Sequence, residues 1–285
     1  MRRFTQPLGI LTTLVVIYLL PTAAEAQATR TWVSGVGDDA NPCSRTAPCK
    51  TFAGAISKTA AGGEIDALDP GGFGAVTITK GVTIDGGGGQ VASILVSGTN
   101  GIVVQAGPTD VVTLRNLSIN GIVGTGTGGL NGVRYLSGAA LHIENCNIMG
   151  FTGDGINVAT STIGALFVTD TFLTDNNNGI QIAPTAANVR STLVRVRAQG
   201  NSGYGFFLHP GASVGAGTVI TDSTALNNGT GIGVTGATLY LGNSVIIRNN
   251  VGVSISGGSV LSYKTNMIDG NISGDGTPLM GLSLN

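Results

Sequence analysis

The sequence predicts an all-β fold, a right-handed parallel β-helix in which each coil holds three short strands. Glycine accounts for 47 of the 285 residues, more than twice its usual share of about 7%. Between the glycines, apolar and polar residues alternate with the period of a β-strand. A pattern of about 24 residues also recurs along the chain, as expected for a solenoid.

Two other glycine-rich classes do not fit. Collagen requires glycine at every third residue, and the sequence has no such spacing. Disordered low-complexity chains lack apolar residues, whereas 42% of this chain is hydrophobic. A fold built from many tight turns remains.

Residues 1–26 are expected to form a signal peptide. Arg2 and Arg3 are basic, an apolar run follows over residues 8–20, and Ala24 and Ala26 are small residues at the positions that a signal peptidase recognises. Cleavage is therefore expected before Gln27, which gives a secreted or periplasmic protein with no remaining transmembrane segment. An uncleaved membrane anchor is the alternative, but the run is shorter than the ~20 residues that a span requires.

The repeat has two recognisable parts. Alternating segments begin at Val112, Leu141, Leu166, Thr192, Thr218 and Leu239. Each is followed by a glycine that opens a further apolar alternation, and these glycine anchors are Gly132, Gly155, Gly179, Gly205, Gly231 and Gly252. One face of all three strands in a coil is expected to point into a shared interior, with Ile156, Ile180 and Ile232 in one apolar column.

A polar residue interrupts each repeat after its first strand. The series is Asn116, Asn145, Asp170, Val196, Asp222, Asn243 and Lys264. Asn and Asp tolerate the left-handed backbone of a sharp corner, and stacked amides can hydrogen-bond along the axis. Val196 suggests a register slip of one residue, and Lys264 suggests that the helix is ending there.

Two other β-rich folds are weaker alternatives. A leucine-rich horseshoe requires leucines at fixed positions, whereas the inward residues here are mixed. A β-sandwich gives no reason for a glycine anchor in every repeat of about 24 residues.

Residues 27–62 are expected to form an N-terminal cap, followed by the β-helix over residues 63–285. Cys43 and Cys49 are expected to pair in an oxidising compartment, although two free thiols remain the alternative. Apolar residues at helical spacing within residues 48–61 predict a short capping helix, with a surface helix as the alternative; they are Phe52, Ala53, Ile56 and Ala60. Cys146 is expected to be a small core residue.

Charge and composition exclude several partners. The chain carries 14 basic and 15 acidic residues, and loss of Arg2, Arg3 and Glu25 leaves a net charge of about −2, unlike the basic domains that bind nucleic acid. No metal or cofactor is expected. A zinc site at the cysteines is disfavoured because the only two histidines, His142 and His209, are far away in sequence and have no neighbouring ligands. His142 is expected to be an outward polar residue.

The coil pattern Leu-x-Ile-x-Asn-Cys-x-Ile followed by Gly-Ile-x-Val resembles right-handed parallel β-helix repeat proteins of the pectin-lyase-like superfamily. The N-terminal segments, residues 41–53 and 63–71, resemble secreted bacterial members of unassigned function. The resemblance covers essentially the whole mature chain. It implies the fold but little about activity, because this fold serves lyases, hydrolases, epimerases, adhesins and phage tailspikes.

In enzymes of that superfamily the substrate lies along the strand that follows the glycine anchor. The outward residues of this strand are Arg134, Asn157, Gln181, Phe207, Gly233 and Ser254, and His209 extends the same face. Arg134, Asn157 and Gln181 are candidates for binding sugar hydroxyls or carboxylates, and Phe207 is a candidate for stacking on a sugar ring. An ordinary solvated strand face is the alternative.

Catalytic candidates are weaker. Glycoside hydrolysis needs two carboxyl groups, and the nearest are Asp154 and Asp175, in the loops before this strand. The Arg-x-Pro-x-x-Arg element of pectate lyases is absent, as are the Asn-Thr-Asp, Gly-His-Gly and Arg-Ile-Lys elements of polygalacturonases. Convergence of Arg134, Asp154 and Asp175 in one cleft would favour an enzyme.

The sequence thus favours a non-catalytic exported protein that binds a polysaccharide or cell-surface glycan, or serves as a surface scaffold. A carbohydrate-active enzyme with a divergent site, lyase-like or hydrolase-like, is the alternative. Arg190, Arg195 and Arg197 form one basic concentration, which is either a solvated strand face or a site for an acidic glycan.

Overall fold

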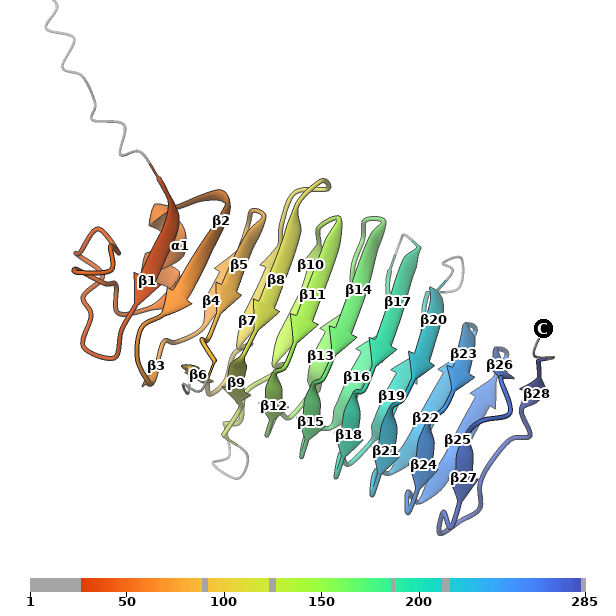
Figure 1. The fold of residues 1–285 in the computed structure, drawn as a ribbon. Helices are drawn as coiled ribbons and strands as arrows, with labels where there is room; N and C mark the ends of the chain where they lie inside the picture. Colours follow the sequence, from red (N-terminus) through yellow and green to blue (C-terminus); the bar gives the residue numbers. More distant parts are fainter. Residues whose placement is uncertain (1–26, 89–91, 123–126, 186–187, 212–215, 283–285) are drawn as a thin grey trace, which may run out of the picture.

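A computed structural model describes residues 27–88, 92–122, 127–185, 188–211 and 216–282. The expected signal peptide lies outside the described residues. The chain winds into a right-handed parallel β-helix, with its coils stacked from the N-terminal to the C-terminal end (Figure 1). Each regular coil contributes one strand to each of three parallel sheets, as predicted.

The three sheets are named here in the order in which a coil visits them. Sheet A contains β1 (Ala28–Val33), β2 (Thr59–Ala67), β5 (Val82–Asp85), β8 (Val111–Arg115), β11 (Ala140–Glu144), β14 (Gly164–Thr169), β17 (Val189–Val194), β20 (Ala216–Thr221), β23 (Thr238–Gly242), β26 (Ser259–Ser262) and β28 (Met280–Gly281). Sheet B contains β3 (Gly71–Gly72), β6 (Ala92–Leu95), β9 (Leu117–Asn120), β12 (Asn147–Met149), β15 (Phe172–Thr174), β18 (Arg197–Gln199), β21 (Thr224–Leu226), β24 (Val245–Ile247) and β27 (Met267–Asp269). Sheet C contains β4 (Val76–Ile78), β7 (Ile102–Gln105), β10 (Val133–Ser137), β13 (Asp154–Val158), β16 (Asn178–Ile182), β19 (Tyr204–Leu208), β22 (Thr230–Thr235) and β25 (Val251–Ser256).

The core is a set of apolar columns that run along the solenoid axis. In sheet C, Ile156 pairs with Ile180, Ile180 with Phe206, and Phe206 with Ile232. These side chains are at most 1% exposed, so the predicted column of Ile156, Ile180 and Ile232 is confirmed. Burial of one such column in each sheet supplies the main driving force for stacking the coils.

The corner between sheets A and B is formed by one left-handed residue per coil. These residues are Asn116, Asn145, Asp170, Arg195, Asp222, Asn243 and Lys264, with φ between 47° and 62°. The slip suggested at Val196 is confirmed, since Arg195 takes the corner and Val196 is buried. Lys264 keeps the corner conformation, and only β27 and the two-residue β28 follow it, with no further described strand in sheet C, so the solenoid is ending there as suggested.

Side chains at this corner bond from coil to coil, as predicted. Asn145 donates to the Oδ1 atom of Asn116 at 2.8 Å, and Asn116 donates to Asp85 at 2.7 Å. Arg195 donates to both carboxylate oxygens of Asp170, at 2.6 and 2.7 Å. The corner residues therefore set the backbone turn and also tie adjacent coils together.

A second ladder, which the sequence analysis did not predict, lies inside the corner between sheets B and C. It consists of Asn176, Asn201, Asn228, Asn249 and Asn271, all 8% exposed or less. The amide nitrogen of each of the first four donates to the amide oxygen of the next asparagine, at 2.8–3.2 Å, and that of Asn271 donates to Asp275. Buried polar groups are costly unless they are paired. A shift of one coil against the next would break these bonds, so the ladder favours a single register of the later coils.

The glycine anchors stand where neighbouring coils approach each other most closely. A Cβ atom on Gly179 would lie 2.5 Å from the carbonyl oxygen of Gly205, and one on Gly205 would lie 2.7 Å from that of Gly231. Real Cβ atoms do not approach backbone oxygens so closely, so any side chain here would push the coils apart. The recurrence of glycine is therefore a packing requirement of the stack.

The N-terminal segment differs in part from the expected arrangement. Helix α1 (Phe52–Lys58) is shorter than residues 48–61, and it buries Phe52 and Ala55, whereas Ala53 is exposed. Ala60 lies in β2 instead of the helix. The helix ends before Ala60 because Thr59 is its C-terminal cap and also the first residue of β2.

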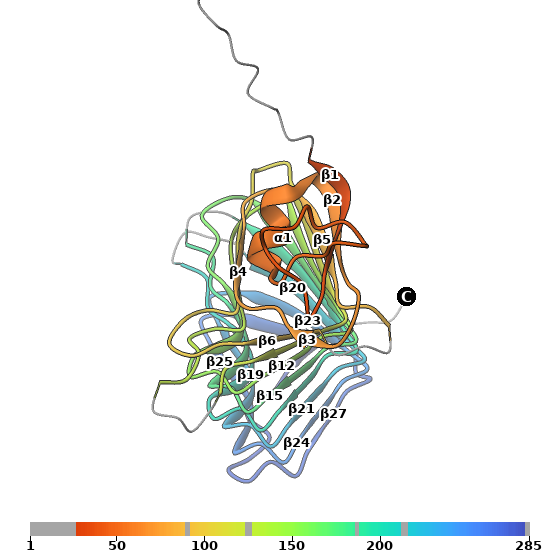
Figure 2. The same ribbon diagram turned by 90° about the vertical axis from the view of Figure 1, so that its left-hand side faces the viewer.

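Strand β1 already pairs with β2 in sheet A, and the expected boundary between residues 62 and 63 falls inside β2. Helix α1 packs against β1, β2 and β4 at the N-terminal end of the solenoid (Figure 2). The ring of Phe52 lies 5.2 Å from that of Phe73. The role of α1 as a cap stays a prediction.

The cysteines behave as expected. Cys43 and Cys49 form a disulfide, and Cys146 is a free thiol with 2% exposure. Within the described part of the chain, no helix is long and apolar enough to cross a lipid bilayer.

Candidate functional site

The outward row predicted on the strand after the glycine anchor is present on sheet C. Arg134 pairs with Asn157, Asn157 with Gln181, and Gln181 with Phe207. The row continues through Gly233 and Ser254. Adjacent members are one strand spacing apart, about 4.8 Å, so the row forms a straight line along the solenoid axis.

Asp154 lies at the start of β13, beside this row, with only 4% of its surface exposed. Its carboxylate accepts hydrogen bonds from Asn157 at 2.6 Å and from Asn178 at 2.8 Å. With its amide nitrogen turned toward the carboxylate, Gln181 also donates to both oxygens, at 3.0 and 3.2 Å. Asp154 thus gathers the amide groups of three side chains from two adjacent coils.

The environment of Asp154 opposes ionisation. Burial raises the pKa of the carboxyl group, and the hydrogen bonds from Asn157 and Asn178 offset only part of that effect. A carboxyl group with a raised pKa can serve as an acid or a base. However, its oxygens here are covered by amides, so the group is better placed to orient Asn157 and Gln181.

A polar chain links Asp154 to other coils. Its backbone N–H donates to the amide oxygen of Asn131, which in turn donates to Asn100. On the other side, Asn178 accepts from the backbone N–H of Tyr204 at 2.8 Å. The alternation of the strands gave no signal for Asn131, Asn178 or Tyr204; their common feature in the sequence is that each directly precedes a glycine anchor.

Aromatic rings flank the polar row on β19. The ring of Phe207 stacks on Tyr204 with centroids 4.2 Å apart, and on His209 with centroids 5.4 Å apart. Phe207 is half-buried, and both neighbouring rings lie nearly parallel to its own, at 8° and 9°. These two rings cover part of the Phe207 ring, so stacking of a sugar on Phe207 stays a prediction, and Tyr204 and His209 add further aromatic surface.

Gly233 makes room for these rings. A Cβ atom at this position would lie 2.4 Å from Cε1 of Tyr204 and 3.0 Å from Cδ2 of Phe207. The absence of a side chain on the next coil therefore allows the stacked rings to spread over sheet C.

The three catalytic candidates do not converge. Asp175 is an exposed residue of the corner between sheets B and C, with a left-handed φ of 56°. Arg134 is exposed on sheet C and forms no ion pair within the described part of the chain with Asp154 or Asp175. The geometry thus gives no pair of carboxyl groups facing one cleft on sheet C.

A carboxylate cluster lies elsewhere, on the outer face of sheet A. Ligand atoms of Glu64, Asp66 and Asp85 lie within 4.8 Å of one another. Arg30 contacts Glu64 and Asp66, at 2.9 and 2.8 Å, and Arg115 contacts Asp85 at 2.7 Å. Burial and the neighbouring Glu64 raise the pKa of Asp66 to about 6. The two arginines offset the negative charge of the three carboxylates.

The stacked parallel sheets define a right-handed β-helix protein. The chain belongs to the family described as "Right handed beta helix region", whose model matches residues 92–273. The resemblance to the pectin-lyase-like superfamily is therefore confirmed for the fold. A comparison with curated proteins gives no match.

Solved structures with a similar fold include pectate lyase Pel9A, with 14% identity and a TM-score of 0.43, covering 82% of this chain and 74% of that one. A lacto-N-biosidase of family GH136 from Eubacterium ramulus has 9% identity and a TM-score of 0.44, covering 88% of this chain and 67% of that one. At these identities the comparison concerns the fold alone.

Proposed function

We propose that this protein is an exported β-helix that binds a glycan along the outer face of sheet C without catalysing a reaction on it. The observation that carries the proposal is the orientation of two amides by a buried carboxylate. Asp154 accepts from the amide nitrogens of Asn157 and Gln181. The amide oxygens of both residues are then left to accept hydrogen bonds from a ligand.

This arrangement suits a ligand with many hydroxyl groups. Asn157 and Gln181 lie side by side in register, both only partly buried. At one end of the same row, Arg134 adds a cation that forms no ion pair with any described residue. Ordered acceptors need not lose side-chain entropy on binding, which favours affinity. At the other end, the outer faces of Tyr204 and His209 are suited to packing against the apolar face of a sugar.

The location of the protein is part of the proposal. Residues 1–26 have the sequence of a signal peptide, and a disulfide such as Cys43–Cys49 is typical of oxidising compartments. Both features support export.

Catalysis is the second candidate, and one observation favours it: burial raises the pKa of Asp154. Hydrolysis of a glycosidic bond would require a second carboxyl group across the bond. Asp175 is exposed and lies at the sheet B end of the turn between sheets B and C, whereas Asp154 is buried at the start of a sheet C strand, so binding is the better-supported function.

A glycan panel tests both candidates. Binding is measured by calorimetry, and new reducing or unsaturated ends are measured in the same samples. Asn157→Ala and Gln181→Ala are each expected to weaken binding of a positive glycan by about five- to tenfold. Ser254→Ala, in the same row but beyond Gly233, is the matched control and should leave affinity unchanged. Product formation that Asp154→Asn abolishes would contradict the proposal and establish the enzyme.

A further inference from the structure

A second row of side chains lies on the outer face of sheet B. Ser118 pairs with Asn147, Asn147 with Phe172, and Phe172 with Arg197. Asn147 and Arg197 are exposed, and Phe172 is 49% exposed. Phe172 is therefore a more accessible aromatic side chain than Phe207, which is half-buried on sheet C.

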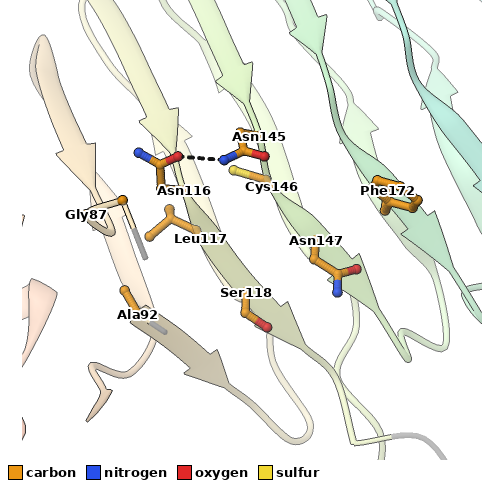
Figure 3. A pocket seen from close by; sticks show the side chains of 10 residues that line it. Gly87, Ala92, Asn116, Leu117, Ser118, Asn145, Cys146, Asn147 and Phe172 are labelled. Carbon is orange, nitrogen blue, oxygen red and sulfur yellow. Dashed lines mark hydrogen bonds between the residues drawn. The ribbon is translucent and has the colours of Figure 1, made fainter. Parts of the chain in front are cut away.

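The first part of this row borders a hollow of about 430 Å³ at the corner between sheets A and B. Figure 3 shows the hollow extending from Gly87 and Ala92, past Ser118 and Asn147, to the ring of Phe172. The other lining residues are Gly88, Asn116, Leu117, Asn145 and Cys146. None of the described lining residues is acidic, and they include both apolar and amide side chains.

Two amides at the hollow have unused hydrogen-bonding capacity. Asn145 is exposed and donates to Asn116 at 2.8 Å (Figure 3), and its own Oδ1 atom accepts no hydrogen bond from the described side chains. Asn147 projects from the middle of the row, exposed at the surface. Both can donate to or accept from a ligand without breaking a contact between the strands.

The far end of the row carries an unpaired cation. The guanidinium carbon of Arg197 lies 5.9 Å from the centroid of the Phe172 ring, and Arg197 forms no ion pair with any described residue. The carboxylates at the neighbouring corner have other partners, since Asp170 binds Arg195 and Asp222 accepts from Asn243. Arg197 therefore has a free fork of N–H donors, which matches a carboxylate.

We infer that the outer face of sheet B is a second binding surface, for a linear acidic polysaccharide. One sugar ring packs on Phe172, the carboxylate of an adjacent uronate binds Arg197, and sugar hydroxyls bond to Asn147 and to Asn145. Successive positions are about 4.8 Å apart, close to the advance of one sugar unit in an extended chain. A single cation in a row of neutral groups does not suit nucleic acid, whose binding uses many phosphate contacts.

This surface uses none of the residues on sheet C, so the inference is independent of the proposed function. The probe is a β-1,4-linked hexamer of mannuronate, with mannohexaose as its uncharged counterpart. Calorimetry at low salt is expected to detect the mannuronate hexamer and to give clearly weaker binding of mannohexaose. Since the protein itself carries a net charge of −1, unspecific attraction to a polyanion does not account for such a difference.

Variants locate the site. Arg197→Gln is expected to weaken binding of the mannuronate hexamer by about tenfold, and Phe172→Ala by about fivefold. Arg190→Gln, an exposed arginine on sheet A, is the matched control and should have no effect. Circular dichroism and the melting temperature should remain close to those of the unsubstituted protein, because both altered side chains are exposed.

Three results would overturn the inference. The first is no binding of the mannuronate hexamer. The second is an equal loss of affinity in Arg190→Gln and Arg197→Gln, which would indicate unspecific charge attraction. The third is loss of hexamer binding in Asn157→Ala but not in Phe172→Ala, which would place the acidic chain on sheet C.

Discussion

Asn201 donates a hydrogen bond from its amide nitrogen to the amide oxygen of Asn228, 2.8 Å away in the next coil. The amide oxygen of Asn201 in turn accepts hydrogen bonds from the side-chain amide and the backbone N–H of Asn176 in the preceding coil, at 3.2 and 3.1 Å. Asn201 and Asn228 are 1% and 3% exposed. One side chain thus joins three coils within a buried corner.

The first prediction concerns this ladder. Asn201→Ala leaves the buried backbone N–H of Asn176 without its acceptor and the carbonyl oxygen of Leu173 without the amide donor of Asn201, and each group left unpaired costs about 1–3 kcal/mol. We expect the free energy of unfolding to fall by about 3 kcal/mol or more, measured by urea denaturation. Asn177→Ala, an exposed neighbour whose side chain accepts only from Ser202, should cost less than about 0.5 kcal/mol. Equal effects would show that the ladder adds no stability.

The second prediction concerns two hydroxyl groups inside the solenoid. Ser191 and Thr218 pair in sheet A, in a column otherwise filled by Leu166 and Leu239. Neither hydroxyl has a hydrogen-bond partner, and burial of an unpaired hydroxyl is costly. Thr218→Val keeps the shape and removes the hydroxyl, so we expect a gain of about 1 kcal/mol in thermal and urea denaturation. Thr192→Val, on the outward side of the same sheet, is the control; a loss of stability in Thr218→Val would indicate a buried water at this position.

The third prediction concerns the disulfide near α1. The two cysteines are separated by six positions, and a short loop contributes about 2 kcal/mol or less. Cys43→Ser is therefore expected to lower the melting temperature under oxidising conditions and to have little effect in reductant. Mass spectrometry of the native protein should show Cys43 and Cys49 linked; two free thiols would contradict the pairing.

The fourth prediction concerns the carboxylate cluster on sheet A. The pKa of Asp66 is raised from 3.8 to about 6, first by burial and then by Glu64. Because the folded state binds the proton more tightly, the stabilisation from protonated Asp66 is complete below about pH 4 and is lost as the pH rises through about 6.

Asp66→Asn should therefore raise the melting temperature at pH 7, with a gain that shrinks toward pH 4. Exposed Asp269→Asn serves as the control. A gain in Asp66→Asn that is independent of pH would show that titration of Asp66 is not its cause.

Much of this protein was determined by its sequence alone. Strand alternation places Ile156 and Ile180 on the inward side of their strands. Glycine recurs where the backbones of neighbouring coils come too close for a side chain. Asparagine or aspartate at the corner permits a left-handed turn. These are local requirements of the backbone. Because they recur in every coil, the same residue pattern recurs along the sequence and can be recognised there.

Tertiary structure decided what depends on neighbouring coils. Asp154 resembles any loop carboxylate in the sequence, and its burial beneath Asn157 and Gln181 arises only when two coils stack in register. Phe207 stacks on Tyr204 and His209 over the bare backbone of Gly233 in the next coil, whereas Phe172 is exposed beside Arg197 of the next coil, although alternation places both aromatic residues on outward positions. Alternation specifies the side of a strand on which a residue lies, whereas burial on that side depends on residues about 24 positions away along the chain.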